Sequence, residues 1–232
     1  MINKLNANFK IFLPVIHVAN EDQGIKQTSL SLLNGADGVF LINHSIPYFE
    51  LFWIYRKIRN LFPKSWIGIN CLDLDPIQVI KRMPKDIDGL WVDNSYINEE
   101  LGYNQGYAKD ILDTIHDTGW DGLYFGGVAF KYQKKVKDLI KTTEIACKYM
   151  DIITTSGTGT GVPPTIKKIE IMSEIIHKNN KKLAIASGIT PKNIKQYKSA
   201  DIFMVATGIS TNFTHFNPKL VKKLQQQIHF YI

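Results

Sequence analysis

The sequence predicts an α/β protein with one domain, residues 1–232, folded as a single (βα)8 TIM barrel. Short apolar runs alternate eight times with longer amphipathic segments, which is typical of strands and helices around a parallel sheet. The length of 232 residues is close to the roughly 250 typical of this barrel. Three consecutive glycine-bearing loops follow the last three strand-like runs. A doubly wound open sheet is the alternative, but no GxGxxG pattern follows the first strand.

The first half of the chain contains four of the expected strand and helix pairs. Pro14 is expected to mark the entry of the first strand, because a proline deeper inside would remove a hydrogen bond from the sheet. Asp75 and Pro76 predict a helix start, as an N-cap followed by proline at the first helical position. The expected strands cover 13–18, 38–42, 66–71 and 89–92, and the expected helices cover 23–34, 47–61, a segment from 75 onward, and 107–117.

The second half repeats the alternation with the same helix-start chemistry. Residues 93–106 form a loop long enough to favour a functional role. Proline lies near the expected start of three later helices, at Pro163, Pro191 and Pro218. The expected strands cover 122–125, with a continuation to 132, then 151–155, 183–186 and 201–206, and a helix is expected over 136–148.

Composition and net charge limit the kinds of partner that can be expected. The net charge of +7 comes from 25 lysines and only three arginines, scattered along predicted helices. A lysine-rich background explains this charge as well as nucleic-acid binding does, and no zinc-finger, RNP or helix-turn-helix pattern is present. Nucleic acid is therefore not expected as a partner, whereas homo-oligomerisation is left open.

Compartment and cysteine chemistry follow from simple counts. No apolar run approaches the roughly 20 residues of a membrane helix. The first residues also lack the basic, apolar and small-residue order of a signal peptide. We expect a cytoplasmic protein without membrane insertion. Cys71 and Cys147 have no metal-type spacing and are expected to be free, buried thiols.

The three glycine loops indicate an anion site. Glycine lets the backbone bring its N–H groups close to a ligand oxygen, and a following helix start adds further free N–H groups. In this barrel fold, phosphate commonly binds after strands seven and eight. The sequence therefore predicts a phosphorylated small-molecule ligand, held by Ser156, Gly157, Ser187, Gly188, Ile189, Thr207, Gly208 and Ile209.

Polar residues at the ends of the other strands are the candidates for chemistry. Lys131 could neutralise a phosphate, although a solvated loop lysine is the alternative. Asp93 and His17 are acid/base candidates, since burial could bring either pKa toward neutrality, and His17 could instead be a core histidine. Asn94 and Asn70 complete the predicted catalytic set. His17, Asp73 and Asp93 could together bind a metal but lack local spacing, so neither a metal nor a nucleotide cofactor is predicted.

Several of these segments together resemble a known family. They are Val15–Val18, Gly68–Asp73, Val92–Asn94, Asn104–Gly106, Val128–Lys131, Thr155–Gly161, Ser187–Asn193 and Ala206–Ser210. On these motifs the chain resembles the BtpA family of TIM-barrel proteins over nearly its whole length, most strongly from Trp91 onward. The family usually has an acidic residue where Ile42 lies, aspartate at Asn104 and histidine at Tyr132. The resemblance implies a barrel with a phosphorylated or nucleotide-like ligand, and it implies no particular reaction.

Two functions are therefore carried forward. The first is a cytosolic TIM-barrel enzyme acting on a sugar phosphate, a phosphoribosyl compound or a nucleotide-like molecule, with Lys131 as countercharge. The second is a non-catalytic ligand-binding or membrane-complex assembly factor on the same scaffold, because the three departures each remove a titratable group. Binding to nucleic acid or another anionic surface through the +7 charge is a third and weaker interpretation.

Overall fold

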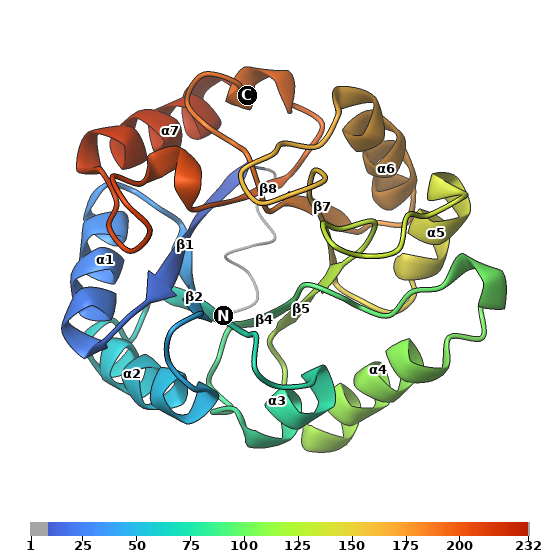
Figure 1. The fold of residues 1–232 in the computed structure, drawn as a ribbon, viewed down its shortest axis with the longest axis horizontal. Coiled ribbons are helices and arrows are strands. Elements are labelled where there is room, and N and C mark those ends of the chain that lie inside the picture. The colour runs from blue at the N-terminus through green and yellow to red at the C-terminus, as the bar shows by residue number, and fades with distance from the viewer. Residues whose placement is uncertain (1–8, 232) are drawn as a thin grey trace.

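The computed structural model describes residues 9–231 and shows a closed barrel of eight parallel strands, each hydrogen-bonded to the next (Figure 1). This confirms the predicted fold class. Pairing of β1 with β8 closes the cylinder, with Ile11 opposite Ile202. The strands are β1 Ile11–Val18, β2 Gly38–Asn43, β3 Trp66–Cys71, β4 Gly89–Val92, β5 Leu123–Gly127, β6 Ile152–Thr155, β7 Lys182–Ile185 and β8 Ile202–Val205.

Helices surround the barrel and cover the outer faces of the strands (Figure 1). The α-helices are α1 Glu21–Leu33, α2 Tyr48–Leu61, α3 Pro76–Arg82, α4 Gly106–Thr118, α5 Leu139–Ala146, α6 Ile166–Lys178 and α7 Pro218–Tyr231. Three short 3-10 turns lie in loops at η2 Glu99–Leu101, η3 Ile194–Gln196 and η4 Thr207–Ile209. Among the residues that the structure describes, no helix combines the length and apolarity needed to cross a bilayer.

One helix start forms as its sequence predicts, and a second lies slightly later than expected. The Asp75 carboxylate accepts a hydrogen bond of 3.0 Å from the Ile77 N–H, and Pro76 occupies the first turn of α3. Before α6, Thr165 is the N-cap, and its hydroxyl accepts from the Lys168 N–H at 3.3 Å. Helix α6 thus begins at Ile166, slightly later than the expected start near Pro163.

The connection from β7 to β8 differs from the prediction. An α-helix was expected from Pro191, but the chain forms only the single turn η3. The Asn193 side chain explains the difference, because it accepts from the Thr190 N–H at 2.8 Å and donates to the Gly188 carbonyl at 2.8 Å. Asparagine that binds nearby backbone groups in this way favours a turn over a helix.

Pro14 also lies elsewhere than predicted. It is the fourth residue of β1, opposite Val205 of β8, rather than the entry of the strand. The ladder from β1 to β2 begins at the next residue, Val15. The strand tolerates proline at this position because its pairing changes from β8 to β2 there.

Aromatic side chains fill the barrel interior near the amino ends of its strands. Phe40, Trp66 and Phe125 pack edge-to-face or tilted, with ring centroids 5.1–5.9 Å apart. Gly68 and Gly89 make this possible, since a Cβ on either would lie within 2.8 Å of the Trp66 ring. These rings therefore fill the middle of the barrel interior, below the cavity at the carboxyl ends of the strands.

The outer core packs the helices against the strands, and it contains both cysteines. Cys71 and Cys147 are buried and free, which confirms their prediction. At the amino end of β3, Arg59 of α2 forms an ion pair with Asp88, whose carboxylate also accepts from the Ile67 N–H at 2.8 Å. Because the Arg59 and Asp88 side chains are only 11% and 10% exposed, this pair ties α2 to the barrel.

Candidate functional site

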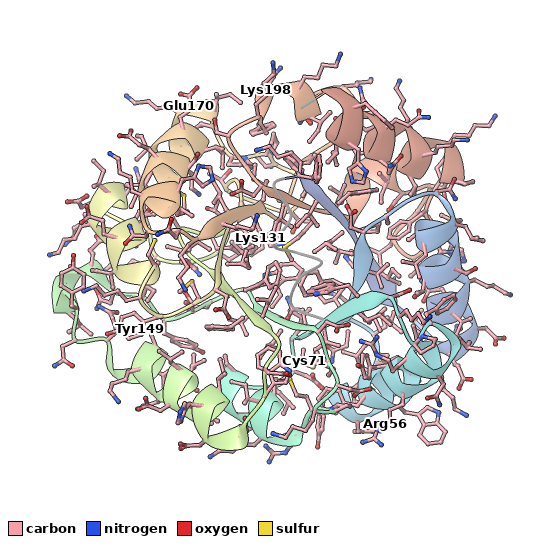
Figure 2. The ribbon with its side chains drawn as sticks, turned by 180° about the vertical axis from the view of Figure 1, so that it is seen from behind. Arg56, Cys71, Lys131, Tyr149, Glu170 and Lys198 are labelled. Atoms are coloured by element: carbon pink, nitrogen blue, oxygen red, sulfur yellow. The ribbon has the colours of Figure 1, made fainter. Side chains whose placement is uncertain are left out.

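A cavity of about 270 Å³ opens at the carboxyl ends of the strands. Its floor is apolar and consists of inward-facing side chains of Val15, Ile42, Trp91, Ala186 and Met204. Its rim is polar and comes from six different strand ends: His17, His44, Asp93, Lys131, Ser187 and Thr207. Figure 2 shows Lys131 near the middle of the ring of strands, whereas Arg56, Glu170 and Lys198 lie at the periphery.

Backbone N–H groups without protein acceptors surround one side of this cavity. Gly188, Ile189, Thr207 and Gly208 line it, and within residues 9–231 their N–H groups donate to no protein atom. The prediction included Ile209, but its N–H donates to the Ala206 carbonyl at 3.0 Å. Its side chain is fully buried in the outer core. The available set therefore keeps the predicted Gly188, Ile189, Thr207 and Gly208 and loses Ile209.

Gly188 and Gly208 hold neighbouring loops against each other. Gly188 has a φ of +67°, and a Cβ there would lie 2.5 Å from the Val162 carbonyl carbon. A Cβ on Gly208 would overlap the Ile189 carbonyl oxygen and lie 3.1 Å from the Thr190 Cα. The loop after β7 therefore packs backbone on backbone against the loop after β6 at Gly188 and against the loop after β8 at Gly208. This contact brings the N–H groups of the two loops together at one side of the cavity.

Among the residues that the structure describes, Lys131 is the only lysine or arginine that lines the cavity. It forms no ion pair within 4.0 Å in the described part of the chain, and its ammonium lies 5.6 Å from the centroid of the Phe130 ring. The Lys131 N–H donates to the Ser156 hydroxyl at 2.7 Å. Ala129 and Tyr132 on either side have positive φ values of 47° and 63°. Such backbone is costly for residues other than glycine and fixes the position of the lysine.

Asp93 follows β4 and faces the cavity beside Lys131. Burial raises the pKa of the Asp93 carboxyl, and the charge of Lys131 and a hydrogen bond from Asn70 oppose this rise. The Asn70 amide donates to the carboxylate at 2.9 Å. Asn70 is itself buried and absent from the cavity wall, so it orients Asp93 and does not reach a ligand.

His17 lies in an aromatic cluster with His44 and Phe213, at ring-centroid distances of 4.7 Å and 4.2 Å. Burial, and to a smaller extent the neighbouring His44, lower the pKa of His17 to about 4. The ring is therefore neutral at pH 7. Its Nδ1 lies 3.1 Å from the Phe213 carbonyl oxygen, which can only accept, so Nδ1 carries the proton. The Nε2 atom is then an available base.

Three other predicted residues lie outside the cavity, where their contacts hold the surrounding loops in place. The Asn94 side chain accepts from the Tyr96 N–H at 2.9 Å and lines a neighbouring cavity between the β4 and β5 loops. Ser156 is fully buried and holds the Lys131 backbone. A Cβ on Gly157 would meet the Pro163 backbone at 2.6 Å, so this glycine lets the loop after β6 fold on itself.

The loop after β6, residues 156–165, reaches over the cavity. Its Gly161 N–H donates to the Ser187 hydroxyl at 3.0 Å. Its Thr160 hydroxyl lies 3.2 Å from the Tyr132 hydroxyl. Both Thr160 and Gly161 line the cavity. The loop therefore bridges the β5 and β7 loops.

Several residues at the cavity were not predicted from the sequence, and four of them are Trp91, Tyr132, Thr160 and Phe213. Trp91 lies in its floor, and its indole N–H is buried without an acceptor in the described residues. Tyr132, Thr160 and Phe213 come from loops, and Phe213 lies in a segment with no distinguishing motif. An inward position in β4, two residues before Asp93, is the only sequence signal for Trp91.

The three residues considered as metal ligands do not form one site, because His17 and Asp93 line the cavity but Asp73 does not. Asp73 accepts from the Asn43 amide at 2.6 Å and from the Tyr48 N–H at 2.9 Å, which ties it to the start of α2. In residues 9–231, no group of three histidine, cysteine or acidic side chains has metal-binding geometry.

Solved structures share this fold at low sequence identity. One is (S)-3-O-geranylgeranylglyceryl phosphate synthase from Thermoplasma acidophilum, solved with sn-glycerol-1-phosphate, with a TM-score of 0.66, 12% identity, and coverage of 98% of this chain and 96% of that one. Phosphoribosyl anthranilate isomerase from Thermus thermophilus has a TM-score of 0.59, 12% identity, and coverage of 94% and 97%. The tryptophan synthase alpha subunit from Legionella pneumophila has a TM-score of 0.65, 12% identity, and coverage of 98% and 96%.

No protein-family model and no curated protein matches the sequence significantly. At identities of 11–14%, the structural likeness shows the barrel fold alone. The function must therefore be argued from the site itself.

Proposed function

We propose that this protein binds a small phosphorylated molecule in the cavity at the carboxyl ends of its strands and acts on it by proton transfer. The observation that carries this proposal is the set of unpaired N–H groups of Gly188, Ile189, Thr207 and Gly208 around a cavity that also contains Lys131. Donors fixed in this way suit a group that accepts many hydrogen bonds and carries negative charge.

The energetics favour a phosphate over a neutral group. Hydrogen bonds to a charged partner contribute about 1.5–3 kcal/mol each, so several amides and one ammonium can hold a phosphate without arginine. The three arginines of the chain lie on α2 and α3, away from this cavity. Neighbours with the same fold support the ligand class, since the Thermoplasma enzyme was solved with a glycerol phosphate.

Two groups supply the acid/base chemistry of the proposal. Neutral His17 presents Nε2 as the base, because Nδ1 donates to Phe213. Asp93, with a pKa raised by burial, is the partner that can give or take a proton within the same cavity. Two titratable groups with opposite pKa shifts in one site are typical of acid/base catalysis.

Binding of phosphate is the first test. Isothermal titration with inorganic phosphate, sugar phosphates, phosphoribosyl compounds and nucleotides should give saturable heats for at least one phosphorylated ligand. The matching dephosphorylated compounds should bind at least tenfold more weakly. If no phosphorylated compound binds and inorganic phosphate is also inert, the proposal is wrong.

A second candidate function is a non-catalytic, BtpA-like ligand-binding or assembly factor. It is favoured by two positions where the family usually has a titratable group. Ile42 is part of the apolar floor, and the Tyr132 hydroxyl contacts Thr160 of the covering loop. Ile42 contributes no acid or base, and Tyr132 offers a phenol in place of an imidazole. If His17→Gln and Asp93→Asn retain ligand binding and leave the cellular role intact, this candidate replaces the enzyme.

A further inference from the structure

A lysine outside the cavity joins the two loops that hold Lys131 in place. Lys168 lies in the first turn of α6, and its side-chain ammonium donates to the Ala129 carbonyl at 2.5 Å and to the Ser156 carbonyl at 2.8 Å. Ala129 belongs to the loop after β5, and Ser156 directly follows β6. Lys168 is not among the residues that line the cavity, so it does not reach a ligand there.

The position of Lys168 is unfavourable for a positive charge. Burial lowers the pKa of its ammonium to about 8. Among the residues that the structure describes, Lys168 forms no ion pair with a carboxylate that would offset this burial. The side chain also belongs to the first turn of a helix, where the helix dipole disfavours cations. Departures from such rules are expected at functional sites, which directs attention to the two hydrogen bonds that this ammonium forms.

The two carbonyls that Lys168 binds belong to residues that fix the backbone around Lys131. The Ser156 hydroxyl accepts from the Lys131 N–H at 2.7 Å. Ala129 lies two residues before Lys131 and has a φ of +47°, a conformation that persists only where surrounding contacts hold it. The loop after β5 is therefore held at Ala129 and again at Lys131, and Lys168 binds the residue responsible at each point.

The Lys131 ammonium depends on this backbone for its position. In the described part of the chain its side chain forms no ion pair, and no other lysine or arginine lines the cavity. We infer that Lys168 is a positioning residue that holds Lys131 at the phosphate site by fixing the loop after β5. This inference rests on the proposed function, and it adds a residue that phosphate binding requires but that does not contact the ligand.

The test is a double-mutant cycle, measured by titration calorimetry with inorganic phosphate. Lys168→Met should weaken phosphate binding about tenfold in the wild-type background. In the Lys131→Met background the same change should weaken it less than about twofold, because no ammonium is left to position. If Lys168 attracted phosphate directly by its charge, or acted only through general stability, its removal would weaken binding equally in both backgrounds. Equal losses would therefore overturn the inference.

Lys167→Met is the matched control. Lys167 precedes Lys168 in the same turn of α6 and is exposed, so this variant loses the same charge without losing the two carbonyl contacts. Its affinity for phosphate should equal that of wild type. If Lys168→Met binds phosphate like Lys167→Met while Lys131→Met binds it weakly, Lys168 has no positioning role and the proposed function stands.

A second variant covers the case in which Lys168→Met does not fold. Ser156→Ala removes the hydroxyl that accepts from the Lys131 N–H, so it should also weaken phosphate binding in the wild-type background and have less than about a twofold effect in Lys131→Met. Equal losses in the two backgrounds would again overturn the inference. Wild type that binds no phosphate at all would refute the proposed function, and this inference with it.

Discussion

Replacing Gly208 with alanine should damage the phosphate site through a single methyl group. The added Cβ would overlap the Ile189 carbonyl oxygen and lie 2.9 Å from the carbonyl carbon, so the β7 and β8 loops must separate. These atoms belong to the backbone and cannot rotate away. Overpacking of this kind typically costs about 1–3 kcal/mol of the free energy of unfolding. The same displacement moves the N–H groups of Ile189 and Gly208 away from a bound phosphate.

The loss of binding can be estimated from those hydrogen bonds. One donor to a charged acceptor contributes about 1.5–3 kcal/mol, so misplacing even one N–H group weakens phosphate binding by about 10- to 100-fold. Titration calorimetry with the best phosphorylated ligand measures the binding loss. Urea unfolding followed by circular dichroism measures the change in stability separately.

Gly106→Ala is the matched control for this experiment. A Cβ on Gly106, the first residue of α4, meets no atom within 4 Å. Alanine there should leave binding unchanged and leave stability equal or slightly higher, because alanine favours helix. If Gly208→Ala binds phosphate and unfolds like Gly106→Ala, the two loops do not pack as described and the amide site is wrong.

Three further predictions concern the charged groups. Lys131→Met should weaken phosphate binding in calorimetry by about 10- to 100-fold, while Lys134→Met, at a side chain 81% exposed, should not. The lowered pKa of His17 means that unfolded protein binds more protons between pH 6.5 and 4, so stability falls as pH falls through this range. Between pH 7 and pH 5, the free energy of unfolding measured by urea titration should fall by about 2 kcal/mol more in wild type than in His17→Gln. Equal decreases in the two proteins would contradict the buried neutral ring. Arg59→Met should lower the free energy of unfolding in urea by about 3 kcal/mol, because it leaves Asp88 without its partner. An equal decrease in Arg56→Met, at an exposed position, would refute the role of the ion pair with Asp88.

The fold could be predicted because each element carries a local signal. Alternation of apolar runs with amphipathic segments depends only on nearest positions in the chain, and Asp75 with Pro76 starts a helix through contacts within a few residues. The glycines of the last two loops were also informative. Their physical role proved broader than predicted, since they permit loops to pack backbone on backbone as well as leaving N–H groups available.

The details of the site could not be predicted in the same way. Whether Ile209 or Thr207 has a free N–H depends on the short turn η4, which no residue type specifies. Asn94 was selected by its place at a strand end, yet its side chain forms a local turn with Tyr96. Whether the Trp91 indole N–H has an acceptor depends on all the residues that pack around it, so only the three-dimensional structure can show that it has none in the described residues.

The aromatic packing of Phe40, Trp66 and Phe125 has a consequence for how a ligand enters and leaves the cavity. Because these rings pack against one another below the cavity, a bound molecule exchanges with solvent on the side of the carboxyl ends of the strands. On that side Thr160 and Gly161, in the segment 156–165, contact Tyr132 and Ser187. Shortening this segment would remove both contacts and should speed the release of a bound molecule.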